Sequence, residues 1–332
     1  MKAIIPVAGA GTNLRPHTYT QPKPLIPVAG KPILSFIIDK LIQNGVTDFI
    51  FVIGYLGEKI RLFVEQKYPG IRKEFIYQEP RLGSAHAIRL AVEYLKKSEE
   101  IVIQFGDTIV DLDMKKFLSS EHSSIAVKRI EHPQSFGVAE MNKERLILKI
   151  IEKPKIPKSN WALVGLYKIN DLDTFIKALE FIISHDIKTY AEFQLTDALM
   201  HMIEQGHKFY GFEVDNWWDC GQKDQLLQTN ALLLDKEPIK ENENVKLERT
   251  ILIPPVSIGA HCHITDSIIG PHVTIGESSR IQKSVIWNSI IGNFSKLDEA
   301  VLKKSVIGND VIIKGFSQSL NIGDNADIDL SH

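Results

Sequence analysis

The sequence is poor in cysteine and in long apolar segments. Its 332 residues include only Cys220 and Cys262, too few for a disulfide framework and typical of a reducing compartment. No apolar run approaches the roughly 20 residues that a membrane-spanning helix needs. The N-terminal segment 1–7 lacks the apolar region and cleavage site of a signal peptide, because glycine, threonine and arginine follow at once. These absences predict a soluble cytoplasmic protein with no membrane partner.

An excess of charge of one sign is also missing. The chain has 39 lysines and arginines against 41 aspartates and glutamates, a net charge of −2. Proteins that bind nucleic-acid polymers usually carry a basic excess or a basic face, so we expect no such partner. The hydrophobic share of 44% and the charged share of 24% are those of a globular protein and exclude disorder. At about 150 residues a domain, the length predicts two domains.

Residues 1–235 alternate short β-rich runs with helical patterns, which predicts an α/β domain with parallel strands and right-handed crossovers. The expected strands are 3–7, 49–53, 74–77, 101–105 and 209–214. The expected helices run from Pro32 to Gly45 and over 58–68, 84–97, 172–184 and 190–205. Between residues 123 and 168 the pattern predicts an antiparallel insertion that lines the same cleft. In such sheets ligands bind beyond the carboxyl ends of the strands.

The remaining chain has a different rhythm. The charged stretch 236–250 predicts a linker, and residues 251–332 repeat the dipeptide Ile-Gly at intervals of 15 to 17 residues. The dipeptides begin at Ile258, Ile275, Ile291, Ile307 and Ile322. Hexapeptide-type repeats of this kind indicate a parallel β-helix, in which aliphatic residues stack inward. An irregular β-domain is the alternative.

A glycine-rich loop follows the first strand. In Gly9–Pro16 the glycines allow backbone N–H groups to converge on an anion without obstruction by a Cβ, although a tight turn is the simpler interpretation. The loop has neither the Walker ending nor the dinucleotide-binding spacing. Lys23 and Lys31 follow on a proline-stiffened segment, and with Arg15 they would neutralise a polyphosphate.

These residues resemble the signature of the sugar-1-phosphate nucleotidyltransferases, Gly-x-Gly-Thr-x-Leu-x-Pro followed by Pro-Lys-Pro-Leu-x-Pro-Val. Further segments resemble family motifs in family order: Gln78–Ala85, Phe105–Asp107, Phe136–Val138, Glu152–Pro154, Gly165–Tyr167, Glu192–Asp197 and Trp218–Gly221. The resemblance implies transfer of a nucleotidyl group from a nucleoside triphosphate to a sugar 1-phosphate, with release of pyrophosphate. It also implies a Rossmann-like mixed sheet, followed by a short left-handed parallel β-helix that makes oligomer contacts in a dimer to tetramer or covers the first domain.

The resemblance carries roles to individual residues. The catalytic candidates are Arg15, Lys23, Asp107, Lys153 and Asp219, of which Asp107 and Asp219 are the expected Mg²⁺ ligands. The nucleotide-binding candidates are Ala8, Gly9, Gly11, Thr12, Asn13, Gln78, Gly83 and Ser84. The candidates for binding the sugar phosphate are Gly137, Glu152, Lys153, Gly165 and Glu192. The alternatives are solvated turns or helix caps for the aspartates and exposed charges for the lysines.

The base is indicated by Gln78. An amide carries both a donor and an acceptor, which suits uracil and thymine, whereas a carboxylate suits guanine. The sequence therefore favours dTTP or UTP, and the resemblance favours glucose 1-phosphate. The neighbouring Glu79 keeps a mannose-1-phosphate guanylyltransferase as an alternative.

One position departs from the family pattern. Asn13 stands where the family loop has an arginine, so stabilisation of the phosphoryl charge should fall unless Arg15 substitutes. The alternative is a weakly active or non-catalytic relative that binds a nucleotide or sugar nucleotide and regulates. A second alternative is acyl transfer at His261, His263 or His272 of the β-helix. A metal site on 261–263 is disfavoured because neighbouring strand residues alternate faces.

Overall fold

The computed structural model describes residues 1–95, 100–236 and 242–315. The chain forms two compact units, Met1–Thr229 and Asn230–His332, and the boundary falls inside helix α7 (Lys223–Lys236). Each unit is described by itself. Within the described ranges, no helix combines the length and the apolar character needed to cross a membrane.

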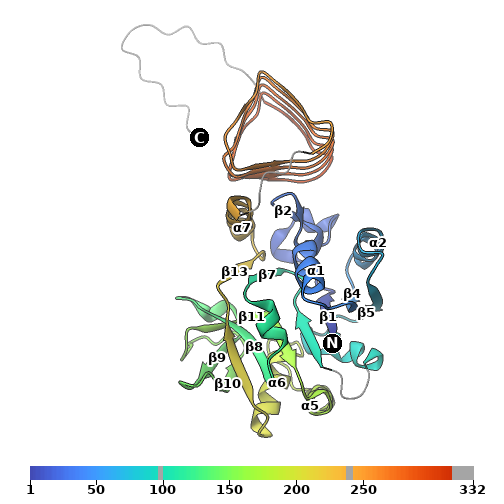
Figure 1. Ribbon diagram of the computed structural model, residues 1–332, viewed down its shortest axis with the longest axis vertical. Coiled ribbons are helices and arrows are strands. Elements are labelled where there is room, and N and C mark those ends of the chain that lie inside the picture. The colour runs from blue at the N-terminus through green and yellow to red at the C-terminus, as the bar shows by residue number, and fades with distance from the viewer. Residues whose placement is uncertain (96–99, 237–241, 316–332) are drawn as a thin grey trace. The chain divides into compact units, whose positions relative to one another are not determined.

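The first unit is built on a nine-stranded mixed sheet with the order β10-β9-β11-β6-β1-β4-β5 (Figure 1). In addition, β8 pairs with β11, and β12 pairs with β8. Its parallel part consists of β1 (Lys2–Val7), β4 (Asp48–Ile53), β5 (Arg72–Tyr77) and β6 (Ile101–Gln104). Its remaining strands are β8 (Ser123–Arg129), β9 (Val138–Met141), β10 (Ile147–Ile151), β11 (Trp161–Ile169) and β12 (Phe209–Glu213). The parallel core and the antiparallel insertion predicted from the sequence are both present, because β11 pairs antiparallel with β6, β8 and β9.

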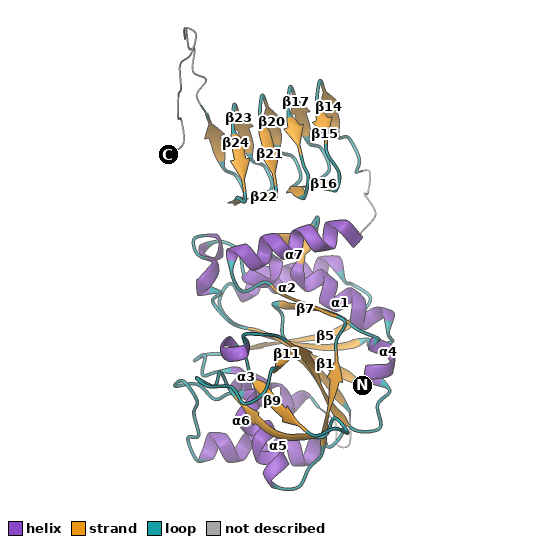
Figure 2. Ribbon diagram, turned by 90° about the vertical axis from the view of Figure 1, so that its left-hand side faces the viewer, coloured by secondary structure: helices purple, strands orange, loops and turns teal. Residues whose placement is uncertain are grey.

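Helices lie against the sheet (Figure 2), and their buried side chains are mostly apolar. They are α1 (Ile33–Gln43), α2 (Gly57–Lys67), α3 (Ser84–Ala91), α4 (Met114–Leu118), α5 (Leu172–Ser184) and α6 (Leu195–Glu204). Burial of the aliphatic and aromatic side chains of α3, α5 and α6 in one cluster with β1, β4 and β6 supplies much of the stability of this unit.

Two predicted helices differ from the structure. The helix expected over 84–97 is α-helical only to Ala91 and continues as a 3₁₀ turn over Val92–Tyr94, while residues 96–99 lie outside the described ranges. The helix expected over 190–205 begins at Leu195. Tyr190 and Ala191 have φ angles of 55° and 62°, which an α-helix cannot contain.

A small two-stranded sheet brings the segments of Asp107 and Asp219 together. Strand β7 (Thr108–Asp111) pairs antiparallel with β13 (Asn216–Asp219), which sets Asp219 opposite Thr108. The Cys220 N–H also donates to the Asp107 carbonyl oxygen, at 3.2 Å. Two aspartates 112 positions apart in the sequence therefore become neighbours beyond the end of β6.

The second unit is a parallel β-helix of triangular cross-section, whose coils stack in register (Figures 1 and 2). One sheet contains β14 (Lys246–Glu248), β17 (His263–Thr265), β20 (Arg280–Gln282), β23 (Lys296–Asp298) and β26 (Ile312–Lys314). A second contains β15 (Ile251–Leu252), β18 (Ile268–Ile269), β21 (Val285–Trp287) and β24 (Val301–Lys303). The third contains β16 (Val256–Ile258), β19 (Val273–Ile275), β22 (Ser289–Ile291) and β25 (Val306–Ile307). This is the arrangement of a left-handed β-helix, as the repeat indicates.

The first coil begins earlier than the sequence indicates. Residues 246–248, assigned above to the linker 236–250, form β14 and pair with β17. A three-residue strand inside a charged stretch offers no periodicity to detect. Residues 237–241 of that linker and the Ile322 repeat lie outside the described ranges.

Candidate active site

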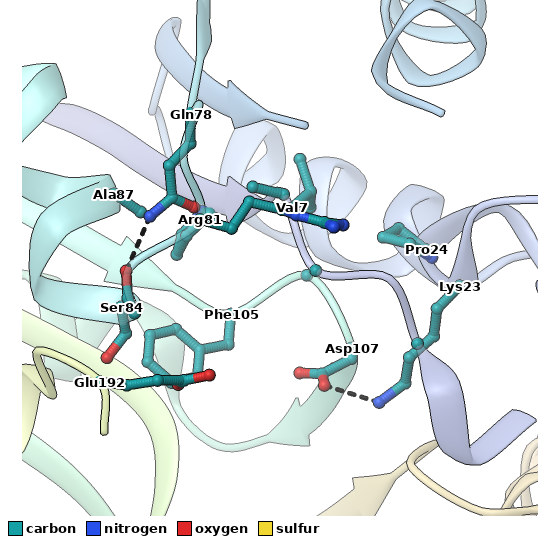
Figure 3. Close-up of a pocket in the computed structure, with 16 residues that line it drawn as sticks. Val7, Lys23, Pro24, Gln78, Arg81, Ser84, Ala87, Phe105, Asp107 and Glu192 are labelled. Atoms are coloured by element: carbon teal, nitrogen blue, oxygen red, sulfur yellow. Dashed lines mark hydrogen bonds and ion pairs between the residues drawn. The ribbon is translucent and has the colours of Figure 1, made fainter. Parts of the chain in front are cut away.

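A pocket of about 290 Å³ lies at the carboxyl ends of the parallel strands (Figure 3). Nine of the residues singled out from the sequence line it: Ala8, Gly9, Gly11, Lys23, Gln78, Gly83, Ser84, Asp107 and Glu192. They come from the loops after β1, β5 and β6 and from the segment before α6. Because parallel strands end at one edge, the fold gathers residues that are far apart in the sequence.

The glycine loop is shaped by its backbone. Gly11 has a φ of 61°, and a Cβ there would lie 3.0 Å from the Cβ of Lys23 and 3.1 Å from a methyl group of Thr18. The Gly11 carbonyl accepts hydrogen bonds from the Leu14 N–H at 3.0 Å and from the Thr18 hydroxyl at 2.8 Å. Glycine at position 11 therefore lets the loop approach the segment that carries Lys23.

Lys23, Asp107 and Asp219 form the charged centre of the site. The Lys23 ammonium contacts the Asp107 carboxylate at 2.6 Å. Burial opposes ionisation of both groups, but their mutual attraction prevails, so the pKa of Lys23 is raised and that of Asp107 is lowered. Burial and the negative charge of Asp107 raise the pKa of Asp219, more than Lys23 lowers it. The lysine thus offsets the charge of only one of two neighbouring carboxylates.

The chemistry of this donor set suits a magnesium ion. Mg²⁺ prefers carboxylate oxygens and keeps several waters and substrate phosphates as its other ligands, so two carboxylates suffice. Burial first, and then the charge of Asp107, raise the pKa of Asp219, and a divalent cation would offset both effects by favouring the charged carboxylate. Within the described residues, no cluster of three or more histidine, cysteine or acidic side chains is arranged to hold a metal without substrate.

Gln78 is fixed by two hydrogen bonds on one side of its amide. Its Nε2 donates to the Gly83 carbonyl oxygen at 2.9 Å and lies 3.1 Å from Nδ1 of His86. A carbonyl accepts only, so the nitrogen of the amide must face Gly83. Figure 3 shows the amide oxygen turned away from that bond. Gln78 is only 5% exposed, so both amide hydrogens are used within the protein and Oε1 remains as an acceptor.

Gly83 joins this wall of the pocket to the segment that carries Glu192. Its φ is 113°, and a Cβ would lie 2.5 Å from the Phe193 carbonyl oxygen. The Phe193 N–H donates to Leu82 at 2.8 Å, and the Ser84 hydroxyl oxygen accepts from the Leu195 N–H at 2.9 Å. Ser84 therefore holds the first residue of α6 in addition to lining the pocket.

Glu152 lies in a second polar cluster outside the pocket lining. Its carboxylate accepts from the Thr196 hydroxyl at 3.0 Å and lies 3.8 Å from the Lys153 ammonium, which is half exposed. Burial raises the pKa of Glu152. A Cβ at Gly137 would come within 3.2 Å of the Glu152 carboxylate. Gly165, with a φ of 79°, lies behind the ring of Phe105 and not in the pocket lining.

Three of the loop residues lie away from the pocket lining. Thr12 and Asn13 belong to a 3₁₀ turn, Thr12–Leu14, and both are exposed. The Arg15 guanidinium is exposed and lies 5.0 Å from the centre of the Tyr19 ring. The turn at Gly11 directs this part of the loop outward, which the sequence spacing does not reveal.

Two residues that line or support the site were missed by the sequence analysis. His86, on α3, contacts the amide of Gln78, and Arg81 lines the pocket between Gln78 and Gly83. Arg81 stands inside the motif Gln78–Ala85, and its positive charge within a nucleotide-binding motif could have marked it as a phosphate-binding candidate. His86 lies one residue beyond that motif and offered no signal of its own.

The histidines of the β-helix have individual polar partners. His263 lies 3.3 Å from Glu248, and His272 lies 3.1 Å from Asp235. His261 lies 3.4 Å from the Asn244 amide. Acyl transfer at these residues stays an alternative prediction.

The chain matches the family model for nucleotidyl transferases over residues 2–236. It belongs to the nucleotidyl transferase family. This nucleotidyl transferase is 35% identical over 259 residues to the bifunctional protein GlmU of Methanococcus vannielii, which covers 76% of this chain and 59% of the relative. The chain thus spans less than two thirds of that relative's length.

Other relatives match over most of both lengths. A glucose-1-phosphate thymidylyltransferase of Streptomyces antibioticus is 30% identical over 316 residues, covering 88% of this nucleotidyl transferase and 87% of the relative. The low-salt glycan biosynthesis nucleotidyltransferase Agl11 of Haloferax volcanii is 29% identical with the same coverage. A solved structure from Bacillus anthracis, provisionally named a glucose-1-phosphate thymidylyltransferase, superposes with a TM-score of 0.62 at 27% identity and covers 72% of this chain and 98% of that one. The family shown is the one that the sequence motifs indicate.

Proposed function

We propose that this nucleotidyl transferase joins a nucleoside triphosphate to a sugar 1-phosphate and releases pyrophosphate. The observation that carries the proposal is the convergence of the glycine loop, Lys23 and Asp107 on one pocket. Asp219 is not one of the lining residues but lies beside Asp107, on the strand that pairs with β7. Backbone N–H groups and one lysine suit a polyphosphate, and two carboxylates suit a magnesium ion.

The chain's own groups bind, orient and neutralise. An oxygen of the sugar phosphate attacks the α-phosphorus, the bond to the bridging α–β oxygen breaks, and pyrophosphate leaves with the bond's electron pair. Two anions must approach each other, so positive charge and alignment are the main requirements. Lys23 neutralises the nucleotide phosphates by exchanging its contact with Asp107 for a contact with a phosphate oxygen. Lys153 holds the attacking phosphate of the sugar. Asp107 and Asp219 would hold Mg²⁺, which would supply positive charge to offset that of the phosphates.

The fixed amide of Gln78 supports a base with a ring N–H. Its free Oε1 accepts from N3–H of uracil or thymine, whereas the ring nitrogens of adenine and cytosine would meet it lone pair to lone pair. Guanine N1–H would satisfy the same acceptor. The thymidylyltransferase names of relatives support dTTP or UTP and glucose 1-phosphate. A mannose-1-phosphate guanylyltransferase is the second candidate, because Gln78 Oε1 does not discriminate against guanine.

The sugar side is proposed to include Glu192, which reaches the pocket, and the cluster of Gly137, Glu152 and Lys153. Gly165 keeps the backbone close behind Phe105. Glu152 and Glu192 would accept hydrogen bonds from sugar hydroxyls. For the nucleotide, Ala8, Gly9 and Gly11 would contribute backbone N–H groups, whereas Thr12 lies outside the lining.

We further propose a homo-oligomer formed through the β-helix. On the sheet β15-β18-β21-β24, the aliphatic residues Ile251, Ile268, Val285 and Val301 pair in one outward column. Ile251 is 60% exposed and Val301 is 71% exposed. A continuous apolar column on a flat sheet fits the same surface of a second copy. Light scattering of V301D should show a smaller particle than the wild type, and an unchanged mass would refute this surface.

Pyrophosphate release from a panel of triphosphates and sugar 1-phosphates with Mg²⁺ tests the function. We expect turnover with dTTP or UTP, and loss of it in D107N and D219N. The control K40Q changes a partly buried lysine on α1 that is not one of the lining residues. Nucleotide binding without turnover for any pair would favour the non-catalytic alternative that Asn13 raises.

A further inference from the structure

Arg81 brings a guanidinium to the pocket. Among the lining residues, which all belong to the described part of the chain, it is the one arginine and Lys23 is the one lysine. Figure 3 shows the Arg81 side chain crossing the upper part of the pocket from the side of Gln78 toward Val7. It therefore extends from Gln78, the proposed base-binding residue, toward the end of β1, the strand that precedes the glycine loop.

The positive charge of Arg81 has no carboxylate partner within the described residues. Its contact is the ring of Tyr55, 5.8 Å from the guanidinium carbon. Tyr55 is itself held, because its N–H donates to the Ala8 carbonyl at 3.2 Å and its hydroxyl donates to the Tyr19 carbonyl at 3.2 Å. Lys23, in contrast, is already paired with Asp107. Of the two cationic side chains in the pocket lining, Lys23 is paired with a carboxylate and Arg81 contacts only the ring of Tyr55 among the described residues.

The chemistry of a guanidinium matches a phosphate chain. Its planar fork donates two parallel hydrogen bonds to phosphate oxygens, and its charge does not titrate. We propose that Arg81 binds the polyphosphate tail of the nucleoside triphosphate and stabilises the charge on pyrophosphate as it leaves. Asn13, Arg15 and Arg81 are all exposed, but only Arg81 lines the pocket, so Arg81 takes the place that an arginine of the loop would otherwise have. This inference rests on the proposed function.

Four variants test it. R81A removes the guanidinium, R81K keeps a charge without the fork, and R15A removes the arginine of the glycine loop. R61A is the matched control, because Arg61 also lies 5.8 Å from an aromatic ring, that of Phe75, but stands on the exposed face of α2. Steady-state kinetics are measured with both substrates, and pyrophosphate binding is measured by calorimetry with Mg²⁺.

We expect R81A to lower kcat/KM for the nucleotide by about 10²–10³-fold, the scale of losing one charge-stabilising donor. R81K should recover only part of this loss, and R61A should stay within about twofold. The KM for the nucleotide should rise in R81A while the KM for sugar 1-phosphate hardly changes. A general loss of folding would instead lower kcat and leave both KM values unchanged. Pyrophosphate affinity should fall in parallel.

Undiminished nucleotide kinetics and pyrophosphate affinity in R81A would overturn the inference, as would an equal rise in the KM values of both substrates. A loss carried by R15A in place of R81A would also overturn it and assign the role to Arg15. A wild type inactive with every substrate pair would refute the proposed function instead. In that case calorimetry with pyrophosphate still decides whether Arg81 binds phosphates, since it needs no turnover.

Discussion

We predict that protonation of His86 weakens nucleotide binding, because His86 contacts the amide of Gln78. Nδ1 of His86 lies 3.1 Å from the amide nitrogen of Gln78 and accepts its hydrogen only while the imidazole is neutral. Burial lowers the pKa of His86 below its ordinary value, so the ring is neutral at pH 7. Protonation at lower pH would place a second donor against the amide and release Gln78 from its fixed orientation.

The size of the effect follows from one hydrogen bond. A neutral hydrogen bond contributes about 0.5–1.5 kcal/mol, equivalent to an increase of about 2- to 12-fold in the nucleotide KM when it is lost. We therefore expect H86F to raise the KM for dTTP or UTP by this factor at pH 7.5. H86N, whose side-chain oxygen can accept the same hydrogen, should stay close to the wild type. Circular dichroism and thermal unfolding confirm that both variants fold.

The pH profile separates this role from a structural one. Since the folded-state pKa is lowered, the contact is complete above the ordinary value of about 6.5 and is lost as pH falls through the range below it. The KM of the wild type should rise relative to that of H86N over that range, and the comparison cancels titration of the nucleotide's own phosphate. Parallel profiles for the wild type, H86N and H86F would refute the reasoning.

Three further predictions concern stability. G83A should lower the free energy of unfolding in urea by more than the roughly 1–3 kcal/mol of a strained backbone, because alanine is strained at a φ of 113° and its Cβ would also meet the Phe193 carbonyl oxygen. The control G70A should be nearly neutral, because no atom lies within 4 Å of a Cβ at position 70. S284A should cost about 1–3 kcal/mol, because the Ser284 hydroxyl accepts from the buried Ala300 N–H at 3.1 Å, and an unchanged urea midpoint would contradict this. D171A should cost about 1 kcal/mol by removing the N-cap of α5. Hydrogen bonds from Thr174 lower the pKa of Asp171, so this stabilisation is present at neutral pH and is lost as pH falls through that lowered pKa; thermal unfolding of D171A and the wild type should converge there, and a constant difference would count against it.

Periodicity was sufficient for the layout of the sheet and the β-helix. The apolar run 49–53 is a local pattern that indicates a strand buried on both faces of a sheet. The Ile-Gly repeat is a local pattern that indicates stacked coils with one inward column of aliphatic side chains. Periodicity failed where backbone conformation interrupts a pattern. Helix α6 starts at Leu195 because Tyr190 and Ala191 adopt positive φ, and nothing in their side chains signals this conformation.

The sequence by itself determined the family, the parallel α/β framework and the position of Asp107 and Asp219 at the ends of strands. Motif order and strand ends are local properties of the chain. Only the tertiary structure decided which charges face the pocket. Arg15 and Arg81 are both arginines near a family motif, yet the turn at Gly11 leads Arg15 outward over Tyr19, while the tie of Gly83 to Phe193 holds the loop of Arg81 at the pocket. Side-chain direction depends on contacts between segments more than 100 residues apart, such as Gly83 and Phe193, and spacing along the chain does not encode those contacts.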